Sequence, residues 1–322
     1  MAADTLSDVL KTVRMTGAAF FYVSAKAPWV AEQLTREAVL PLILPNAEHM
    51  ISYHVVREGA CYASLLDGET YEVKAGQVVV FTRGDAHVMS SAPGMRAEPP
   101  PPGLIQPGTP LPFRATFGDS GPSTAKLVCG FLACDASPFN PLIENLPRVM
   151  IGDADASDAA PWIRGLARHA WDEANAGIPG SEIMLGKLAE LMFIEVVRQY
   201  IDRLPEGQEN WLAGLRDPLV GRALSLMHGE PARDWDVGTL AKNAGASRSE
   251  FAERFACFVG IPPMQYLAKW RMQLASGLLA NDANIAAVAA EVGYGSEASF
   301  SRAFKKMVGV PPSVWRDQRL AA

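Results

Sequence analysis

One motif occurs twice near the C-terminal end of this 322-residue chain and limits what the chain can fold into. An aliphatic residue, Gly, a second aliphatic residue and Pro-Pro stand at 259–263 and again at 308–312. The likeness continues upstream, because residues 237–263 align with residues 285–312 at an offset of 48 that becomes 49 after one extra residue in the second copy. Self-similarity of this kind indicates one supersecondary unit built twice.

Each copy carries the signals of two short helices joined by a tight turn. An Ala-containing helix ends at a Gly, which tolerates the left-handed backbone of a turn. A Ser then caps a second helix whose two Phe residues, four apart, face the same side. After a closing Gly, the first proline keeps the chain extended and the second starts the next helix. These signals predict two helix-turn-helix units. The predicted turns, caps and ends are Gly245 and Gly293, Ser247 and Ser296, and Gly260 and Gly309.

The second copy, GYGSEASFSRAFKKMVGVPP, combines a Gly turn, Phe-x-Arg-x-Phe, Lys-Lys and Gly-x-x-Pro, and PPMQYLAKWRMQLA reads as a long connecting helix. With these motifs, residues from about 219 to 320 resemble the DNA-binding domain of the AraC/XylS family of bacterial transcription regulators. The resemblance implies an all-α domain with two helix-turn-helix units, whose recognition helices enter successive major grooves about 34 Å apart. It also implies a double-stranded DNA operator and RNA polymerase as partners.

The two predicted recognition helices differ in their residues. By the resemblance, the second places Glu297, Ala298, Ser301 and Arg302 toward the groove and Lys305 and Lys306 toward phosphates. An Arg grips guanine O6 and N7 with two donors, which makes Arg302 the leading base reader. The alternative for these cations is a merely solvated helix face.

The first helix departs from the family pattern. Glu253 stands where the family usually has Arg, and Ala256 and Cys257 replace Lys-Lys. A Glu can accept a hydrogen bond from cytosine N4, but it also repels phosphate. The residues left to bind DNA there are Arg248, Ser249 and Arg254, and Arg254 is as consistent with a solvated face as with DNA contact. We therefore expect the first unit to contribute less affinity.

Charge and composition are consistent with this interpretation. The net charge is −6, but from Asp217 onward twelve Lys and Arg face ten Asp and Glu, so the acidic excess lies upstream. A positive net charge this small in the C-terminal part predicts that DNA binding depends only weakly on salt concentration. No apolar stretch approaches the ~20 residues of a membrane span, and the N-terminus lacks the apolar block of a signal peptide. We expect a cytoplasmic protein with reduced cysteines.

The N-terminal part has the pattern of an antiparallel β domain. Residues 51–91 alternate β-branched and aromatic residues with turn signals, residues 92–112 are rich in proline, and residues 125–135 resemble one more buried strand. The stretch GQVVVFTRGDAH resembles the second cupin motif, except that Thr82 replaces a Pro. His54 and Glu58 match part of the first motif, in which Ser52 replaces a His. The resemblance implies a cupin-like barrel that senses a small-molecule effector.

Cupins hold a metal with three His and a Glu, of which His54, Glu58 and His87 remain. Such a trio could bind a divalent ion, with water or Cys129 completing the site. The alternative is a sensor barrel that has lost its metal and whose His residues are satisfied by hydrogen bonds. A redox pair of Cys129 and Cys134 is weighed against two buried apolar cysteines, since five positions apart on one strand they point to opposite faces. The tentative effector pocket comprises Tyr53, His54, Glu58, Tyr71, Phe81, His87 and Cys129.

The chain thus reads as an α+β protein with a cupin-like domain at 1–150, a helical linker or dimerisation region at 151–216 and the DNA-binding domain at 217–322. Helices are predicted at 157–177 and, with a Ser cap, at 181–204, and the connection at 204–217. The second helix is apolar on nearly every side, so it either packs within its own domain or pairs in a homodimer.

The predicted function is a transcription regulator that is not an enzyme. A metal-dependent cupin enzyme would need a fuller ligand set than Ser52 and Thr82 leave. The sequence has no GxSxG elbow, no metalloprotease spacing among its five His and no phosphate-binding GxxxxGK loop. A DNA-binding protein whose barrel only dimerises, without sensing, remains a further alternative.

Overall fold

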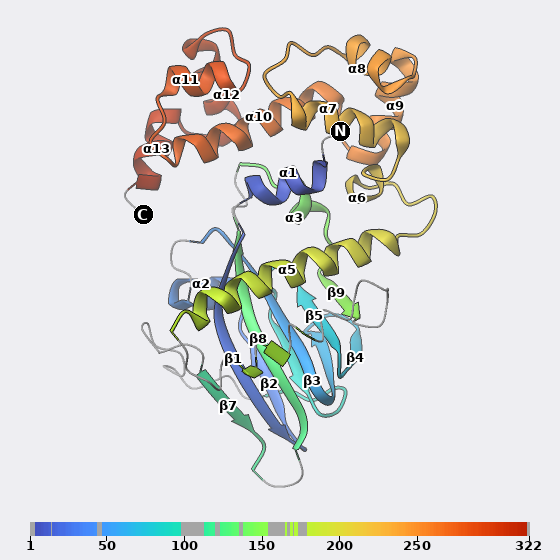
Figure 1. The fold of residues 1–322 in the computed structure, drawn as a ribbon, viewed down its shortest axis with the longest axis vertical. Helices are drawn as coiled ribbons and strands as arrows, with labels where there is room; N and C mark the ends of the chain where they lie inside the picture. The colour runs from blue at the N-terminus through green and yellow to red at the C-terminus, as the bar shows by residue number, and fades with distance from the viewer. Residues whose placement is uncertain are drawn as a thin grey trace. The chain divides into compact units, whose positions relative to one another are not determined.

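The computed structural model of the protein describes residues 4–13, 15–43, 47–97, 113–119, 123–134, 138–153, 165, 168–169, 171–172 and 179–320 (Figure 1). Contacts divide the chain into two compact units. The barrel unit comprises residues 15–134 and 147–203, and the helical unit joins residues 204–322 to two short segments, 1–14 and 135–146. The predicted boundaries follow the order of the chain, whereas contacts group these two N-terminal segments with the C-terminal helices.

The barrel unit is built on one curled sheet that forms a half-barrel. Its strands run in the order β2-β6-β3-β8-β1-β7, with β4 on β3, and with β5 between β3 and β9. Among the described pairs all are antiparallel except β1 with β7. The bounds are β1 Thr16–Lys26, β2 Val30–Gln33, β3 His49–Leu65, β4 Thr70–Lys74, β5 Gln77–Phe81, β6 His87–Ser90, β7 Phe113–Phe117, β8 Ser123–Cys134 and β9 Val149–Asp153. The predicted α+β class and β domain are confirmed.

Strand β3 changes the side it presents to the interior halfway along its length. Just before the middle of the strand Val56 faces inward, whereas after Gly59 the inward residues are Cys61, Ala63 and Leu65. The change occurs at a bulge, where Val56 pairs with Leu127 and Glu58 with Lys126, leaving Arg57 as the extra residue. One extra residue reverses which side chains face the core. This reversal decides the position of Glu58.

Helix α5 (Ser181–Asp202) covers one face of the sheet, against β1, β8 and β9 (Figure 1). Gln199 fixes it to β9, because its side chain donates to the Asp153 carbonyl at 3.1 Å and accepts the Asp153 N–H at 2.9 Å. The predicted Ser181 cap is wrong, since Gly180 precedes the helix without a side-chain cap. On its outer side the helix exposes Ile183, Met184 and Leu191.

The helical unit contains the remaining helices of the C-terminal part together with α1 and α3. Segment 204–217, predicted as a connection, includes the short helix α6, and Trp211 there is almost fully buried, so the segment belongs to the folded unit. The bounds are α1 Thr5–Thr12, α3 Pro141–Asn145, α6 Trp211–Gly214, α7 Pro218–Gly229, α8 Val237–Ala244, α9 Arg248–Val259, α10 Pro263–Leu279, α11 Ile285–Glu291, α12 Glu297–Val308 and α13 Pro312–Leu320.

The repeated signals form the two predicted helix-turn-helix units, α8–α9 and α11–α12, with α10 connecting them. Ser247 and Ser296 cap α9 and α12 by accepting backbone N–H groups at 3.3 and 3.2 Å. The turns contain Gly245 and Gly293, at φ +86° and +81°, and a Cβ on Gly293 would meet the Ala232 carbonyl oxygen at 2.6 Å. Both turns therefore require Gly.

Two other predicted segments can be followed only in part. The proline-rich residues 98–112 and most of the predicted helix at 157–177 lie outside the described residues; within the latter, positions 165, 168, 169, 171 and 172 are helical. The last remaining helix of the described chain is α2 (Arg36–Ile43), which packs on β3. No helix in the described part of the chain is both long enough and apolar enough to cross a membrane.

Candidate functional site

The second helices of the two units, α9 and α12, pack inward through the same pattern of buried residues. Phe251 and Phe255 in α9, and Phe300 and Phe304 in α12, are fully buried, with ring centroids 5.6 and 5.5 Å apart. Helical periodicity places positions two before, two after and five after the first Phe on the opposite side. These outward positions are Ser249, Glu253 and Ala256 in α9, and Ala298, Arg302 and Lys305 in α12.

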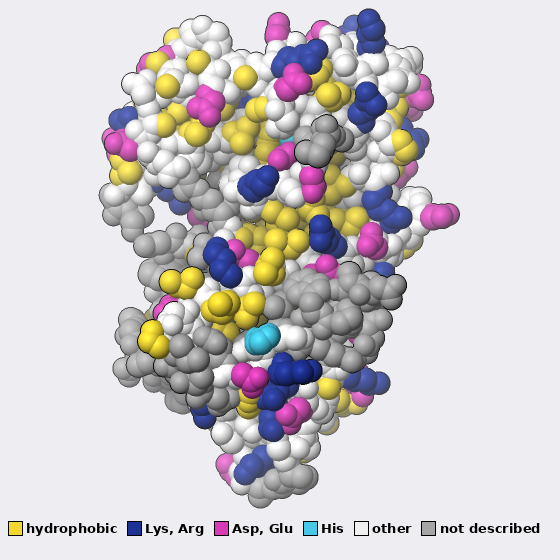
Figure 2. Space-filling model, in the orientation of Figure 1, with side chains coloured by type: hydrophobic (Ala, Val, Ile, Leu, Met, Phe, Trp, Pro, Cys, Tyr) yellow, Lys and Arg dark blue, Asp and Glu magenta, His cyan; other side chains and the backbone are white. Residues whose placement is uncertain are grey.

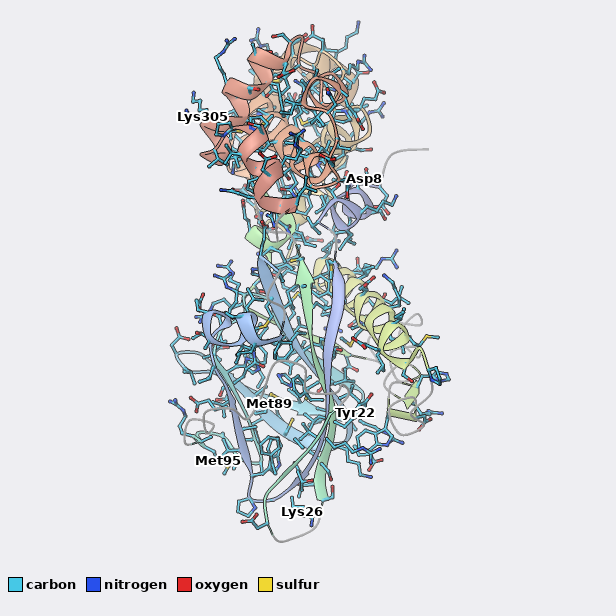
Figure 3. All side chains as sticks on the ribbon, turned by 90° about the vertical axis from the view of Figure 1, so that its left-hand side faces the viewer. Asp8, Tyr22, Lys26, Met89, Met95 and Lys305 are labelled. Carbon is cyan, nitrogen blue, oxygen red and sulfur yellow. The ribbon has the colours of Figure 1, made fainter. Side chains whose placement is uncertain are left out.

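The outward face of α12 is basic, and its cationic side chains are available for binding. Arg302, Lys305 and Lys306 are exposed, and within the described residues none makes a side-chain hydrogen bond or an ion pair. Lys305 lies at the outer surface of its unit (Figure 3). Unpaired guanidinium and ammonium groups on one helix face can bind phosphates and guanine edges without first breaking an internal contact.

The outward face of α9 is acidic, and its one predicted cation in mid-helix is already bound. Arg254 Nε donates to Asp217 Oδ2 at 3.0 Å, and the same carboxylate caps α7 by accepting the Leu219 and Val220 N–H groups. Burial acts to raise the pKa of Asp217, but the hydrogen bonds from Arg254 and from the helix backbone outweigh it and the pKa is lowered. Glu250, Glu253 and Cys257 are exposed beside Arg254. Arg254 is thus a structural ion-pair partner.

An open depression of about 680 Å³ lies between α7 and α8. Arg222, Arg233 and Lys242 line it, together with Asp236 and Thr239. The Asp236 carboxylate is occupied, because it caps α8 by accepting from the N–H and hydroxyl of Thr239 at 2.9 and 2.7 Å. On the face drawn in Figure 2, basic and acidic side chains intermingle over the C-terminal helices, in keeping with the small charge surplus.

The barrel interior brings two of the predicted ligand residues together. The Nε2 atoms of His54 and His87 lie 2.8 Å apart, and the Phe81 ring stacks on His87 with centroids 3.7 Å apart. His87 Nδ1 lies 2.9 Å from the Asp85 carbonyl oxygen, so it donates there. His87 Nε2 then accepts the His54 Nε2–H, and His54 Nδ1 keeps a buried lone pair that has no partner among the described residues. Burial lowers the pKa of His54 well below its usual value and that of His87 to about 4.

The predicted metal trio is not assembled. Glu58 lies on the outer side of β3, half-exposed, where its carboxylate pairs with Lys126 Nζ at 2.7 Å. The cause is the bulge at Arg57, which turns Glu58 away from the side that His54 faces. Within the described residues no three His, Cys, Asp or Glu side chains are grouped to hold an ion. The residues present therefore do not fit a cupin metal.

The predicted pocket residues divide in the same way. Tyr53 neighbours His54 in β3 and so faces the opposite side of the sheet, where it is buried. Cys129 pairs with His54 across β3 and β8 and belongs to the interior core, and Tyr71 is half-buried with its hydroxyl donating to Glu69. The four cysteines are not joined in disulfides, and burial raises the pKa of Cys61 to about 12 and raises that of Cys129.

Two residues that line the depression, Arg222 in α7 and Lys242 in α8, were not among the residues predicted from the sequence. Neither lies in one of the two predicted recognition helices, to which the sequence prediction was confined. Asp217 had a usable signal, because an Asp directly before Pro218 is typical of a helix cap. Its pairing with Arg254, 37 positions away, had none.

Comparison with known proteins identifies the family. The Cupin family matches residues 4–202 and a Helix-turn-helix domain family matches residues 240–318. An AraC-like transcription regulator of Streptomyces lividans is 32% identical over 84% of this chain and 88% of its own length. The chain belongs to the AraC family of transcription regulators. It combines an N-terminal cupin domain with the DNA-binding helix-turn-helix domain of that family.

Two further relatives of this AraC-family regulator are similar over most of their length. An AraC-like transcription regulator of Streptomyces antibioticus is 34% identical over 84% of this chain and 88% of its own length. The HTH-type transcriptional regulator AlkR of Acinetobacter baylyi is 27% identical over 98% of this chain and 99% of its own. These relatives are transcription regulators. Because this chain carries the DNA-binding domain of the AraC family, it is a DNA-binding transcription regulator as well.

Proposed function

We propose that this AraC-family regulator recognises a specific operator chiefly through α12. Arg302 reads a guanine through O6 and N7, and Lys305 and Lys306 bind the flanking phosphates. The observation that carries the proposal is that these three side chains are exposed on the face opposite Phe300 and Phe304 and, within the described chain, have no internal partner. Glu297, Ala298 and Ser301 complete the surface that faces the groove.

Helix α9 serves as the weaker contact in this proposal. Arg248 and Ser249 lie at its exposed N-terminal end, where they can reach the backbone, and Glu253 accepts from a cytosine. Arg254 is not a DNA contact in this proposal, because leaving Asp217 would strand a buried carboxylate that also caps α7. Arg222 and Lys242 in the depression between α7 and α8 supply phosphate contacts that the acidic face of α9 lacks.

The barrel unit conveys a small-molecule signal in this proposal. The buried lone pair on His54 Nδ1, which has no partner in the described part of the chain, suits an effector that donates one hydrogen bond beside an apolar surface containing Phe81 and Cys129. A thiol sensor is a poorer explanation, because thiolates are the reactive form and burial raises the pKa of both Cys61 and Cys129. The effector would change operator affinity by binding one arrangement of the protein better than another.

The outer face of α5 supports a homodimer. Ile183, Met184 and Leu191 are exposed there, on the helix that already covers the sheet with its other side. Pairing two such helices would bury these side chains, and a dimer would present two DNA-binding domains to one operator. Regulation of transcription then proceeds through contact with RNA polymerase.

Footprinting of the purified protein on the DNA upstream of its own gene tests the proposal. Wild-type protein should protect about two consecutive major grooves, and Arg302→Ala should lose or blur the protection. Met307→Ala is the matched control, because Met307 is an exposed, uncharged residue of the same helix. Equal footprints for Arg302→Ala and wild-type protein would contradict α12 as the reader. A thermal-shift screen of small molecules on wild-type protein and on His54→Leu tests the effector separately.

A further inference from the structure

Segment 138–146 is the place where sequence order and packing disagree most. It lies between strands β8 and β9 and inside the stretch that matches the Cupin family, yet it folds with the C-terminal helices. Its helix α3 contacts α6 (Figure 1). Asn140 caps α3 by accepting the Ile143 N–H at 3.1 Å, and Leu142 and Leu146 are almost fully buried. The segment is therefore an integral part of the core of the helical unit.

The segment is joined to α10 by a buried polar contact and an aromatic one. The Phe139 N–H donates to Gln273 Oε1 at 2.9 Å, and Gln273 is only 1% exposed. The Phe139 ring meets Tyr266 edge-on at 5.6 Å, and Lys269 Nζ lies 4.6 Å from its centroid. Separating Phe139 from α10 would leave a buried N–H and a buried amide oxygen without partners.

Tyr266 connects Phe139 to α9, the recognition helix of the first unit. Its hydroxyl accepts the Trp211 Nε1–H at 3.0 Å and donates to His228 Nε2 at 2.8 Å, which fixes the ring in place. The other edge of the ring contacts Phe255 of α9, at 5.8 Å between centroids. A continuous set of packed rings thus runs from Phe139 through Tyr266 to Phe255.

The second unit has a separate core. Phe300 and Phe304 of α12 pack with Met272, Ala275 and Val288, and neither Phe139 nor Tyr266 belongs to that cluster. The same connecting helix therefore supports two cores, and among the described residues segment 138–146 packs in the first of them and not in the second.

We propose that segment 138–146 is a positioning element for α9, acting through Gln273 and Tyr266, and that α12 does not depend on it. The assignment rests on the proposed function only in treating α9 as a DNA-facing helix. Phe139 and Gln273 are positioning residues, because neither side chain reaches the outward face of α9. Loosening the segment should release α9 while α12 keeps its structure and its DNA contacts.

Hydrogen exchange of the full-length protein tests this directly. In Phe139→Ala, backbone amides of α9 should exchange about tenfold faster or more, while those of α12 stay as in wild-type protein. Gln273→Met, which removes the acceptor at similar volume, should change α9 in the same direction. Val288→Ala is the matched control in the second core, and it should raise exchange in α12 instead.

Two results would overturn the assignment: unchanged α9 exchange in both variants, or an equal rise in α9 and α12. If Phe139→Ala does not fold, the milder Gln273→Met decides the question alone. Footprinting separates this proposal from the proposed function. An absence of any wild-type footprint would count against the proposed function and leave the exchange result standing. Variants that lose protection equally in the groove assigned to α9 and in the groove assigned to α12 would contradict the positioning role.

Discussion

The two helix-turn-helix units have the same inward residues and different outward ones. Both bury a pair of Phe residues, both open the second helix with a Ser cap and both turn at a Gly with positive φ. On the outside, Glu253 occupies the position of Arg302, and Ala256 and Cys257 occupy those of Lys305 and Lys306. Packing fixes the inward residues, whereas the exposed residues can change without cost to the fold.

The ion pair in the first unit follows from the same comparison. Arg254 corresponds to Ala303, and in the first unit the carboxylate of Asp217 is placed to bind the Arg254 cation. The first unit has therefore used its mid-helix Arg to hold α7 and α9 together. The second unit has its Arg one position earlier, at Arg302, on the face opposite Phe300 and Phe304, where within the described residues it has no internal partner.

The largest expected effect tests whether the buried Phe residues of the two units contribute equally to the free energy of unfolding. Truncating a fully buried Phe removes apolar contacts and leaves a cavity, so Phe255→Ala and Phe304→Ala should each lower the free energy of unfolding by about 3–5 kcal/mol. Urea unfolding of the full-length protein measures both, with the exposed Met307→Ala as a neutral control. A large cost for one and a negligible cost for the other would break the comparison.

A smaller effect concerns the outward positions. Arg302→Ala removes a bidentate guanine contact and should weaken operator binding by about 1–3 kcal/mol, or roughly 5- to 150-fold. Glu253→Ala should leave affinity unchanged or raise it slightly, because a repulsive carboxylate is lost. Fluorescence anisotropy with a labelled operator measures both. Arg302→Lys keeps the charge, so its affinity separates phosphate attraction from base reading.

A third effect is confined to the first unit. Asp217→Asn keeps a capping side chain but loses the charge that holds Arg254, and it should cost about 1 kcal/mol of stability at neutral pH. Because the folded pKa of Asp217 is lowered, the wild-type contribution is present above the unfolded pKa, about 3.9, and is lost as pH falls through the lower folded value. Thermal unfolding between pH 3 and pH 7 should show a smaller pH dependence in the variant. Identical pH profiles would argue against the pair.

The smallest effects are on salt dependence. Replacing Lys305 and Lys306 with Ala should reduce the slope of log affinity against log salt by about 2, since each Lys releases about one counterion. The reciprocal change, Ala256→Lys with Cys257→Lys, should raise the slope by a similar amount if α9 lies along DNA. Titrations at several salt concentrations sharpen the comparison. An unchanged slope after replacing both lysines would show that α12 does not contact the DNA phosphates.

Short-range signals account for what the sequence predicted correctly. The caps at Ser247 and Ser296, the Gly turns and the proline-started helices α10 and α13 each depend on residues a few positions apart. The strands of the N-terminal part followed from alternation for the same reason. The basic residues of α12 were singled out by the resemblance to the AraC/XylS family, whose motif in this helix is also short.

The errors share a different cause. Glu58 was expected beside His54 because both match the first cupin motif, and a single-residue bulge at Arg57 reversed its side, which no local pattern reveals. Arg254 looked free because its partner lies 37 positions upstream, and segment 138–146 looked like part of the barrel because its partner Gln273 lies 134 positions away from Phe139. Contacts between distant residues are set by tertiary packing, and the sequence around each residue does not specify them.

The most direct test of the central claim is an in vitro selection of binding sites from random DNA with wild-type protein, Arg302→Ala and Glu253→Ala. If the second unit carries most of the sequence recognition, the wild-type protein should select one strongly specified block of bases, Arg302→Ala should lose preference at a position within it, and Glu253→Ala should select the same block. Two equally specified blocks in the wild-type selection, or an unchanged block with Arg302→Ala, would contradict the account.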